Sequence, residues 1–544
     1  MVPSSDKEAK VSTAKMIGFD VSVTQKTHSG NRESLDFLDD GLDPVYQAKA
    51  RILNEAIHEI GMGKYQWFLF IVTGFGWFAD NLWTNVPGLI LLPVVSEFNF
   101  QGPFLKLSEN IGLLIGALFW GLSCDIWGRR WPFNLTLLVI AIFSIASGGS
   151  TNILSLILLT ALYSIGVGGN LPVDSAVFLE FIPGSHQYLL TMLTVWRAIG
   201  QLAGSLIAWP LIANFSCPSD AVICTRPENK GWRYYLFILG GIMFILWFIR
   251  FFVFTMYESP KYLMGRGRDE DAVKVVHAVA SYNGKTSTLS IEHLQSIDSV
   301  KSGDSGSEKR GESDGSMGTG RGETDMSAMG AALRRLRKFD MAHVKALFAT
   351  RKLAWNTSLL ILLWSLIGLA FPLYDSFITV FLQTRGTVFG DGSLFITYRN
   401  QAIVSTVAVP AAFVAGWAVE LPYIGRKGTL AISTGLTGIF LFASTTSRSD
   451  AALLGWNCGY SFTSTIMHGV LYAITPELFA TKDRGTGNAL TATANRIFGV
   501  LSPIVALAAN ITTTVPIWIA GSLLILSGFI ALLLPQEPRG RASL

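Results

Sequence analysis

The feature that most constrains this fold is a series of twelve apolar segments, each long enough to cross a bilayer as a helix. A helix rises about 1.5 Å per residue, so roughly 20 apolar residues span the hydrocarbon core. Half of the 544 residues are hydrophobic and only 15% are charged. Spanning β-strands are shorter and alternate in polarity, so helices are expected. The predicted spans are 66–95, 105–124, 131–149, 152–181, 188–213, 233–256, 353–382, 396–419, 428–446, 451–479, 486–509 and 514–535.

The polar segments between the spans divide the chain into five expected parts. A flexible linker is predicted over 283–330, where Gly, Ser and charged residues dominate. Near the N-terminus an amphipathic helix is expected to lie on the membrane or to pack on the bundle. The parts are an N-terminal tail over 1–64 with that helix at 43–60, a six-helix bundle over 65–256, a partly disordered linker over 257–352, a second bundle over 353–535 and a short tail over 536–544.

The orientation in the membrane is predicted from the basic residues in the short loops. Cytoplasmic loops carry an excess of Lys and Arg, so this pattern places both termini in the cytosol. Cys217 and Cys224 then lie in an outward loop, where they could form a disulfide. We expect the plasma membrane, with a vacuolar membrane left open. The basic residues on the predicted cytosolic side include Arg129, Arg130, Lys261, Arg266, Arg268, Arg426, Lys427, Lys482 and Arg484.

An internal repeat relates the two halves of the chain. Asp375 follows Asp80 by 295 residues, and both lie within expected spans. An acid stands 45 residues further on in each half, as Asp125 and Glu420. Two six-helix repeats are the architecture in which one half rocks against the other around a central site. Further paired landmarks are Gly121 with Gly416, Gly128-Arg129-Arg130 with Gly425-Arg426-Lys427, Glu180 with Glu477, and Arg197 with Arg496.

The loop from Gly121 to Arg130 resembles the loop between spans two and three of the major facilitator superfamily, and the resemblance covers nearly all of residues 60–540. It implies twelve helices in two six-helix pseudo-repeats, and a cytoplasmic latch whose acids and arginines pair in one state and part in the other. The residues expected in this gate are Gly121, Asp125, Gly128, Arg129, Arg130, Glu180, Glu420, Arg426, Lys427, Glu477 and Arg484.

Further segments resemble particular branches of that superfamily. Thr475-Pro476-Glu477 and the segment after Arg484 are similar to sugar porters, and the segment from Gly166 to Pro183 is similar to the synaptic-vesicle-two-related branch. The paired glutamines of hexose carriers are absent from 356–382, which puts a hexose substrate in doubt.

Polar side chains at membrane depth are the candidates for solute and proton binding. A charge at the bilayer centre costs at least about 2.5–3.5 kcal/mol on insertion scales, so it persists where it faces a cavity or a partner. Each acid either binds solute or a proton, or pairs with an arginine for structure; Asp174 is expected to bind solute or to pair with Arg197. Glu109 and Asn110 are expected near the entrance. The candidate site comprises Asp80, Asn81, Asn170, Asp174, Arg197, Gln201, Asp375, His468 and Arg496.

These features favour a secondary transporter of a small polar organic solute, coupled to protons. The alternatives are a uniporter or exchanger of an organic ion or sugar, and a non-transporting membrane sensor or trafficking partner. A phosphate loop, a metal cluster and a nucleophile elbow are not found in the sequence, so an enzyme is not expected, nor is a metal or another cofactor. The expected partners are a small-molecule substrate, protons and the lipid bilayer. No nucleic acid is expected, and the protein is predicted to be a monomer.

Overall fold

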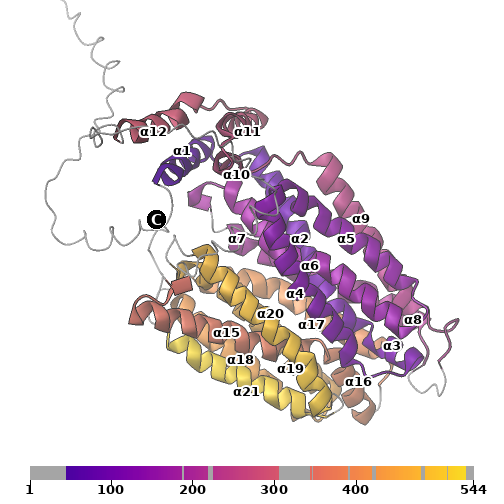
Figure 1. Ribbon diagram of the computed structural model, residues 1–544. Coiled ribbons are helices and arrows are strands. Elements are labelled where there is room, and N and C mark those ends of the chain that lie inside the picture. The colour runs from indigo at the N-terminus through magenta and orange to yellow at the C-terminus, as the bar shows by residue number, and fades with distance from the viewer. Residues whose placement is uncertain are drawn as a thin grey trace, which may run out of the picture. The chain divides into compact units, whose positions relative to one another are not determined.

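The computed structural model describes residues 44–186, 189–218, 224–304, 344–345, 347–389, 392–419, 424–479, 484–510 and 513–534. The chain forms two compact units, Met1–Gln47 and Ala48–Leu544. Of the first unit, only residues 44–47 are described, as the first turn of helix α1 (Pro44–Ile60). All that follows concerns the second unit, whose described residues are helical apart from their connections (Figure 1).

Twelve spans, two of them broken, make up the membrane part of the described chain, and this confirms the predicted count. Ten helices are long and apolar enough to cross a membrane by composition. The other two long helices, α2 and α19, carry more polar residues along the interior. The spans are α2–α3 (Lys64–Leu89, Leu91–Phe98), α4 (Pro103–Trp127), α5 (Arg130–Gly148), α6 (Ile153–Phe181), α8 (Thr194–Phe215), α9 (Gly231–Phe248), α15–α16 (Arg351–Asp375, Ile378–Phe389), α17 (Leu394–Ala418), α18 (Gly425–Thr445), α19 (Asp450–Glu477), α20 (Arg484–Ala509) and α21 (Val515–Leu532).

The neighbours of each helix recur in the two halves, which confirms the repeat. Helix α4 packs on α6 as α17 packs on α19, and α2 packs on α8 as α15 packs on α20. Small residues allow these close contacts, since a Cβ added to Gly116 would lie 2.1 Å from the Ile165 carbonyl oxygen. The halves, α2–α9 and α15–α21, meet mainly where α8 contacts α17 and α4 contacts α20.

Spans one and seven are each broken, whereas the sequence predicted continuous helices over 66–95 and 353–382. Pro93 has no N–H to donate to the Leu89 carbonyl, which accepts a hydrogen bond from the Tyr398 hydroxyl instead. In span seven, Pro372 weakens the last turn of α15, which ends at Asp375 before α16 begins. Both breaks therefore lie where the two halves approach each other.

Two other predicted boundaries differ from the structure. Span five was expected from residue 188, but α8 begins at Thr194 after a short helix α7 (Leu189–Met192). Span six ends in a π-helical turn, Ile249–Val253, and such turns are often found at functional positions.

The N-terminal helix and the first part of the linker pack together at one end of the spans. Leu53 and Ile60 of α1 are buried. Lys49 Nζ lies 2.6 Å from Asp269 Oδ2 of α11 (Asp269–Tyr282), and Lys285 Nζ donates to the Ile60 carbonyl at 2.6 Å. Helices α10 (Pro260–Gly265) and α12 (Ile291–Asp304) complete this end, which we call the linker side. Helix α12 falls within the segment 283–330 predicted to be a flexible linker, so residues 291–304 of that segment are helical.

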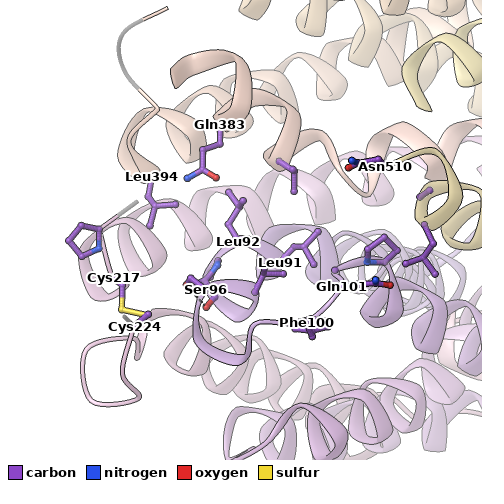
Figure 2. A pocket seen from close by; sticks show the side chains of 18 residues that line it. Leu91, Leu92, Ser96, Phe100, Gln101, Cys217, Cys224, Gln383, Leu394 and Asn510 are labelled. Atoms are coloured by element: carbon purple, nitrogen blue, oxygen red, sulfur yellow. Dashed lines mark hydrogen bonds between the residues drawn. A yellow bond between two sulfur atoms is a disulfide. The ribbon is translucent and has the colours of Figure 1, made fainter. Parts of the chain in front are cut away.

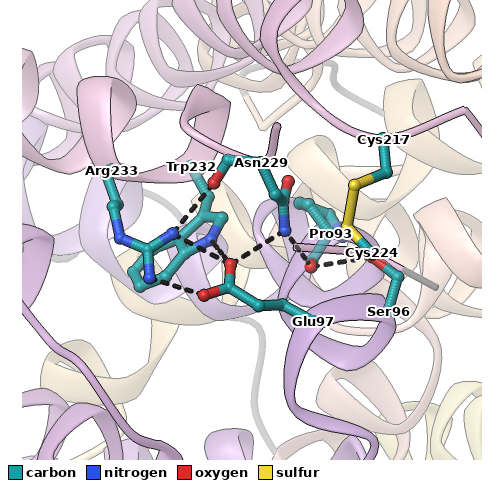
Figure 3. The surroundings of a disulfide bond; sticks show 8 residues. All are labelled: Pro93, Ser96, Glu97, Cys217, Cys224, Asn229, Trp232 and Arg233. Atoms are coloured by element: carbon teal, nitrogen blue, oxygen red, sulfur yellow. Dashed lines mark hydrogen bonds and ion pairs between the residues drawn. A yellow bond between two sulfur atoms is a disulfide. The ribbon is translucent and has the colours of Figure 1, made fainter. Parts of the chain in front are cut away.

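The opposite end of the spans, the disulfide side, is braced by the connection between α8 and α9. A disulfide joins Cys217 to Cys224. Beyond it, Asn229, Trp232 and Arg233 all donate hydrogen bonds to the Glu97 carboxylate of α3, as the dashed lines of Figure 3 show. The Arg233 Nη2 to Glu97 Oε1 distance is 2.6 Å, and both side chains are buried. This cluster fixes α3 against α9.

We predict that the Cys217–Cys224 disulfide forms in the protein isolated from its membrane. Alkylation of the denatured, unreduced protein should then modify only Cys124 and Cys458, the free cysteines. After reduction, all four cysteines should react. Replacing both Cys217 and Cys224 by serine should lower the free energy of unfolding by about 2–3 kcal/mol, because the closed loop is short. Four modified cysteines without reduction would contradict the prediction.

Candidate functional site

Asp80 lies at the centre of the candidate site, between two arginines. It is on α2 and is only 2% exposed. Its Oδ2 lies 3.8 Å from Arg197 Nε of α8, and its Oδ1 lies 3.7 Å from Arg496 Nη2 of α20. A buried carboxylate is stable only when its charge is compensated. The Arg496 pair joins the two halves, so the sequence prediction that grouped these three residues is matched by their placement.

The Asn81 amide holds Arg197 in position beside Asp80. Asn81 Nδ2 donates to the Arg197 carbonyl at 2.8 Å and to Gln201 Oε1 at 3.4 Å. Arg197 Nη2 in turn donates to Asn81 Oδ1 at 3.5 Å. The guanidinium also lies 5.3 Å from the centre of the Tyr472 ring in α19, a cation–π contact across the halves.

A small cavity of about 40 Å³ lies beside this cluster. Both halves line it, and its charged or titratable walls include Arg197, Asp375 and His468. The His468 ring meets Phe371 edge-on at 4.5 Å, and its Nδ1 lies 2.8 Å from the Ser464 carbonyl. Ligand pockets usually measure about 300–1,000 Å³, so this space is much smaller than a typical solute site. Further lining residues are Asn81, Thr194, Ala198, Gln201, Ile378, Val404, Tyr460, Ser461, Thr465 and Gly469.

Asn170 and Asp174 of α6 are fully buried and do not line that cavity. The predicted pairing of Asp174 with Arg197 is wrong. Asp174 Oδ1 instead lies 2.5 Å from Arg250 Nη2, with neither side chain exposed. Arg250 belongs to the π turn of span six, and its guanidinium lies 3.3 Å above the Phe133 ring. The sequence reasoning missed Arg250, because only the π turn rotates this span-end residue into its own half.

Lys106 and Glu109 form a second ion pair in the interior that the sequence reasoning did not identify. Glu109 was expected near the entrance, but it is 1% exposed. Its Oε2 lies 2.7 Å from Lys106 Nζ, which also donates to the Thr84 carbonyl at 2.7 Å. Asn110 Nδ2 donates to the Gly499 carbonyl of α20 at 2.8 Å, so this turn of α4 lies against the other half. The i, i+3 spacing was the signal that could have found the pair.

The halves make direct contacts on the disulfide side of the cavity. Thr379 Oγ1 donates to the Gly88 carbonyl at 2.8 Å, and Ser205 Oγ lies 2.8 Å from Ser405 Oγ. Beyond these contacts a separate pocket of about 630 Å³ opens between α3, the disulfide and the ends of α16, α17 and α20. Figure 2 shows Ser96, Gln101, Gln383 and Asn510 among its mostly apolar walls.

We predict that a side chain at Gly88 will open the contact on the disulfide side. A Cβ there would lie 2.5 Å from the Ser376 carbonyl oxygen of the other half. The clash costs about 1–3 kcal/mol. With Cys124 and Cys458 replaced by serine, Gly88→Leu should raise the reactivity of an introduced Ser405→Cys, which is buried at the contact between the halves, toward a charged maleimide roughly tenfold. Gly241→Leu is the control, since nothing lies within 4 Å of that position. Equal reactivity in both variants would refute this role of Gly88.

The predicted gate residues lie on the linker side, where the described ion pairs stay within one half. Arg129 Nε lies 3.1 Å from Glu180 Oε1, and Arg426 is paired with Glu477. Glu258 accepts the backbone N–H groups of Arg129 and Arg130, at 2.7 and 3.3 Å.

The other gate positions have varied surroundings. Gly128 has a φ of 90°, which favours glycine, and Gly121 has open space around it. Lys427 Nζ donates to the Leu534 carbonyl at 2.7 Å. Burial lowers the pKa of nearby Lys261, although Glu180 acts to raise it. Glu420 and the side chains of Asp125 and Arg484 lie outside the described residues.

Two six-helix halves that meet around a buried charged cavity define a membrane transporter, and not an enzyme. Residues 104–541 match the family described as "Sugar (and other) transporter", and the chain belongs to this family, within the major facilitator superfamily. Over 539 residues it is 56% identical to the "MFS siderochrome iron transporter 1" of Ceriporiopsis subvermispora (strain B), covering 99% of this chain and 100% of that protein.

Two other comparisons agree with this assignment. The chain is 38% identical to the "Major facilitator-type transporter hxnZ" of Emericella nidulans (strain FGSC A4), over 92% of this chain and 89% of that protein. Among solved structures, the partially occluded inward open conformation of the xylose transporter XylE from E. coli matches with a TM-score of 0.64 and 16% identity. That match covers 88% of this chain and 99% of the xylose transporter.

Proposed function

We propose that this transporter carries a small polar organic solute by alternating access, and that proton binding at Asp80 is coupled to the movement. The observation that carries the proposal is the ion pair between Asp80 and Arg496, which joins the two halves beside a cavity that both halves line. A charge that changes at this position alters the attraction between the halves. Asp80, Arg197 and Arg496 are the residues we assign to this coupling.

The distribution of contacts supports an alternating mechanism. The halves touch on the disulfide side at Gly88 and Thr379, while the latch pairs of the linker side, Arg129–Glu180 and Arg426–Glu477, stay within their own halves. In the opposite state the latch residues would pair across the halves and the Gly88 contact would part. The cavity of about 40 Å³ would widen in that rearrangement to admit the solute.

Neutralising Asp80 supplies the bias between the two states. A protonated Asp80 attracts Arg197 and Arg496 less, so the two states differ in free energy by the change in that attraction. We place the disulfide side in an oxidising compartment and both termini in the cytosol, in a plasma-membrane protein that acts as a monomer.

The chemistry of the cavity walls supports a polar organic solute. Arg197, Asp375 and His468 offer charges of both signs or hydrogen bonds, and Phe371 and Tyr460 offer aromatic faces. The curated name of the first relative above makes a siderochrome the first compound to test. Asp375 also suits an organic cation, so a uniporter or exchanger is the second candidate.

The experiment that tests the proposal is an uptake screen in a strain that lacks this transporter. The strain is compared with and without the gene on a panel that contains a siderochrome, organic acids, vitamins, sugars and organic cations. A solute that accumulates only with the gene, and only with an acid-outside gradient, supports the proposal. Uptake that an uncoupler leaves unchanged favours the uniporter or exchanger. A purified protein that moves no panel solute in liposomes opposes transport of these classes.

A further inference from the structure

The interior of the transporter holds six charged side chains of both signs, which we call the charge ring: Asp80, Lys106, Glu109, Arg197, Asp375 and Arg496. Direct ion pairs join Asp80 to Arg197 and Arg496, and Glu109 to Lys106. Arg197 and Asp375 line the same cavity, and Glu109 and Arg496 lie on the contacting helices α4 and α20. The ring is neutral when all six groups are ionised, and it crosses the halves at Arg496 and Asp375.

Arg496 is the member of this charge ring that two carboxylates share. Its Nη2 lies 3.7 Å from Asp80 Oδ1, which is too far for a hydrogen bond. That Asp80 oxygen and Glu109 Oε1 are buried and have no hydrogen-bond partner among the described residues, while Glu109 Oε2 is paired with Lys106. The Arg496 guanidinium is therefore held beside Asp80 by charge alone, and it lies on α20, which contacts the helix α4 that carries Glu109.

We propose that Glu109 is the alternative partner of Arg496, and that Arg496 turns from Asp80 to Glu109 when a proton neutralises Asp80. This inference rests on the coupling role of Asp80 in the proposed function. The proton binds a carboxylate oxygen of Asp80 and leaves Arg496 facing one remaining anion. The described charged or titratable groups that act on Glu109 are Lys106 on its own helix, Asp80 on α2, Tyr163 on α6 and Arg496 on α20. Glu109 is thus a positioning residue for Arg496.

The position of Glu109 gives this exchange a direction. Helix α4 begins on the disulfide side at Pro103, so Glu109 lies about 9 Å along the helix from that end. The next residue, Asn110, already holds α20 through the Gly499 carbonyl. A bond from Arg496 to Glu109 would strengthen this same α4–α20 contact. Protonation of Asp80 therefore favours the arrangement in which the halves are closed on the disulfide side and open on the linker side.

The test measures the distance between the halves and needs no solute. Cys124 and Cys458 are first replaced by serine. Trp127→Cys and Trp417→Cys then provide two spin-label sites, at exposed positions on the linker-side ends of α4 and α17. In the full-length protein, Asp80→Asn should increase the long-distance population. Adding Lys106→Met with Glu109→Gln, which leaves the net charge of the ring unchanged, should reduce the ratio of long to short distances in Asp80→Asn about tenfold.

The controls separate the proposed role of Glu109 from the coupling role of Asp80. Ser108→Ala, a buried neutral residue on the same turn, should leave the Asp80→Asn distribution as it is. If Lys106→Met with Glu109→Gln also leaves it as it is, Glu109 is not the alternative partner, while Asp80 keeps its role. If Asp80→Asn does not change the distances in the parent protein, both the coupling role of Asp80 and the exchange of Arg496 are refuted.

Discussion

Replacing Asp80 by asparagine is expected to abolish accumulation of the solute against its gradient. One proton moving down a gradient of one pH unit supplies about 1.4 kcal/mol, enough for about tenfold accumulation of a co-transported neutral solute. The asparagine amide cannot bind that proton, and it fixes the site in a state resembling protonated Asp80. Uptake in the variant should therefore stop when the internal and external concentrations are equal. Accumulation is measured in proteoliposomes, with the solute that the uptake screen identifies and an acid-outside gradient.

Exchange of the same solute between equal pools is the internal control. It requires the rocking motion without net proton movement, so Asp80→Asn should retain it while accumulation is lost. Thr84→Ala, one turn further along α2, tests whether any change in this helix has the same effect. Unchanged accumulation in Asp80→Asn would remove Asp80 from the coupling step. Loss of exchange as well would show that Asp80 acts in the motion itself.

The arrangement of Asp80 and its arginines was accessible from the sequence because it depends on spacing. The 295-residue repeat and lipid-length helices place Asp80 and Asp375 at membrane depth, and Arg197 and Arg496 follow from the same repeat. The helix breaks were not accessible in the same way. A proline gives a local reason for a break, but the Leu89 carbonyl also needs the Tyr398 hydroxyl, which lies 309 residues away.

The ion-pair partners of the buried acids also could not be predicted from sequence spacing. Asp174 could equally have met Arg197, because both are polar residues on neighbouring spans. The partner of Asp174 is Arg250, which lies in a π turn at the end of span six. A π turn adds a residue to the helical turn, and no sequence period predicts it. Glu109 illustrates the reverse error. Polar residues near the start of a span suggest an entrance, yet the contact between α4 and α20 encloses Glu109.

The charge ring and the Asp174–Arg250 pair differ in how their charges can respond. The charge ring crosses the halves and includes carboxylate oxygens without hydrogen bonds among the described residues, so its pairings can be exchanged. The Asp174–Arg250 pair lies within the N-terminal half at 2.5 Å and is wholly buried. Rocking of the halves need not disturb it. We therefore expect it to stabilise the first bundle, which leads to a stability prediction distinct from any effect on coupling.

Replacing Arg250 by methionine is expected to destabilise the protein strongly, by about 3–5 kcal/mol. The change leaves the Asp174 charge fully buried without its partner and removes the guanidinium from the Phe133 ring. Space for relaxation is small, because a Cβ added to Gly76 would already lie 1.7 Å from Asp174 Oδ2. The thermal stability of the purified protein in detergent should fall well below that of Arg226→Met, a change at an exposed loop residue.

The double replacement of Arg250 by methionine and Asp174 by asparagine distinguishes charge from packing. It removes both charges and nearly preserves the shape of the acid, so most of the lost stability should return, since a buried pair is often no more stable than neutral groups of similar volume. If the double variant is as unstable as Arg250→Met, the loss comes from packing against Phe133. If Arg250→Met alone is as stable as the Arg226→Met control, the pair does not hold the N-terminal bundle together.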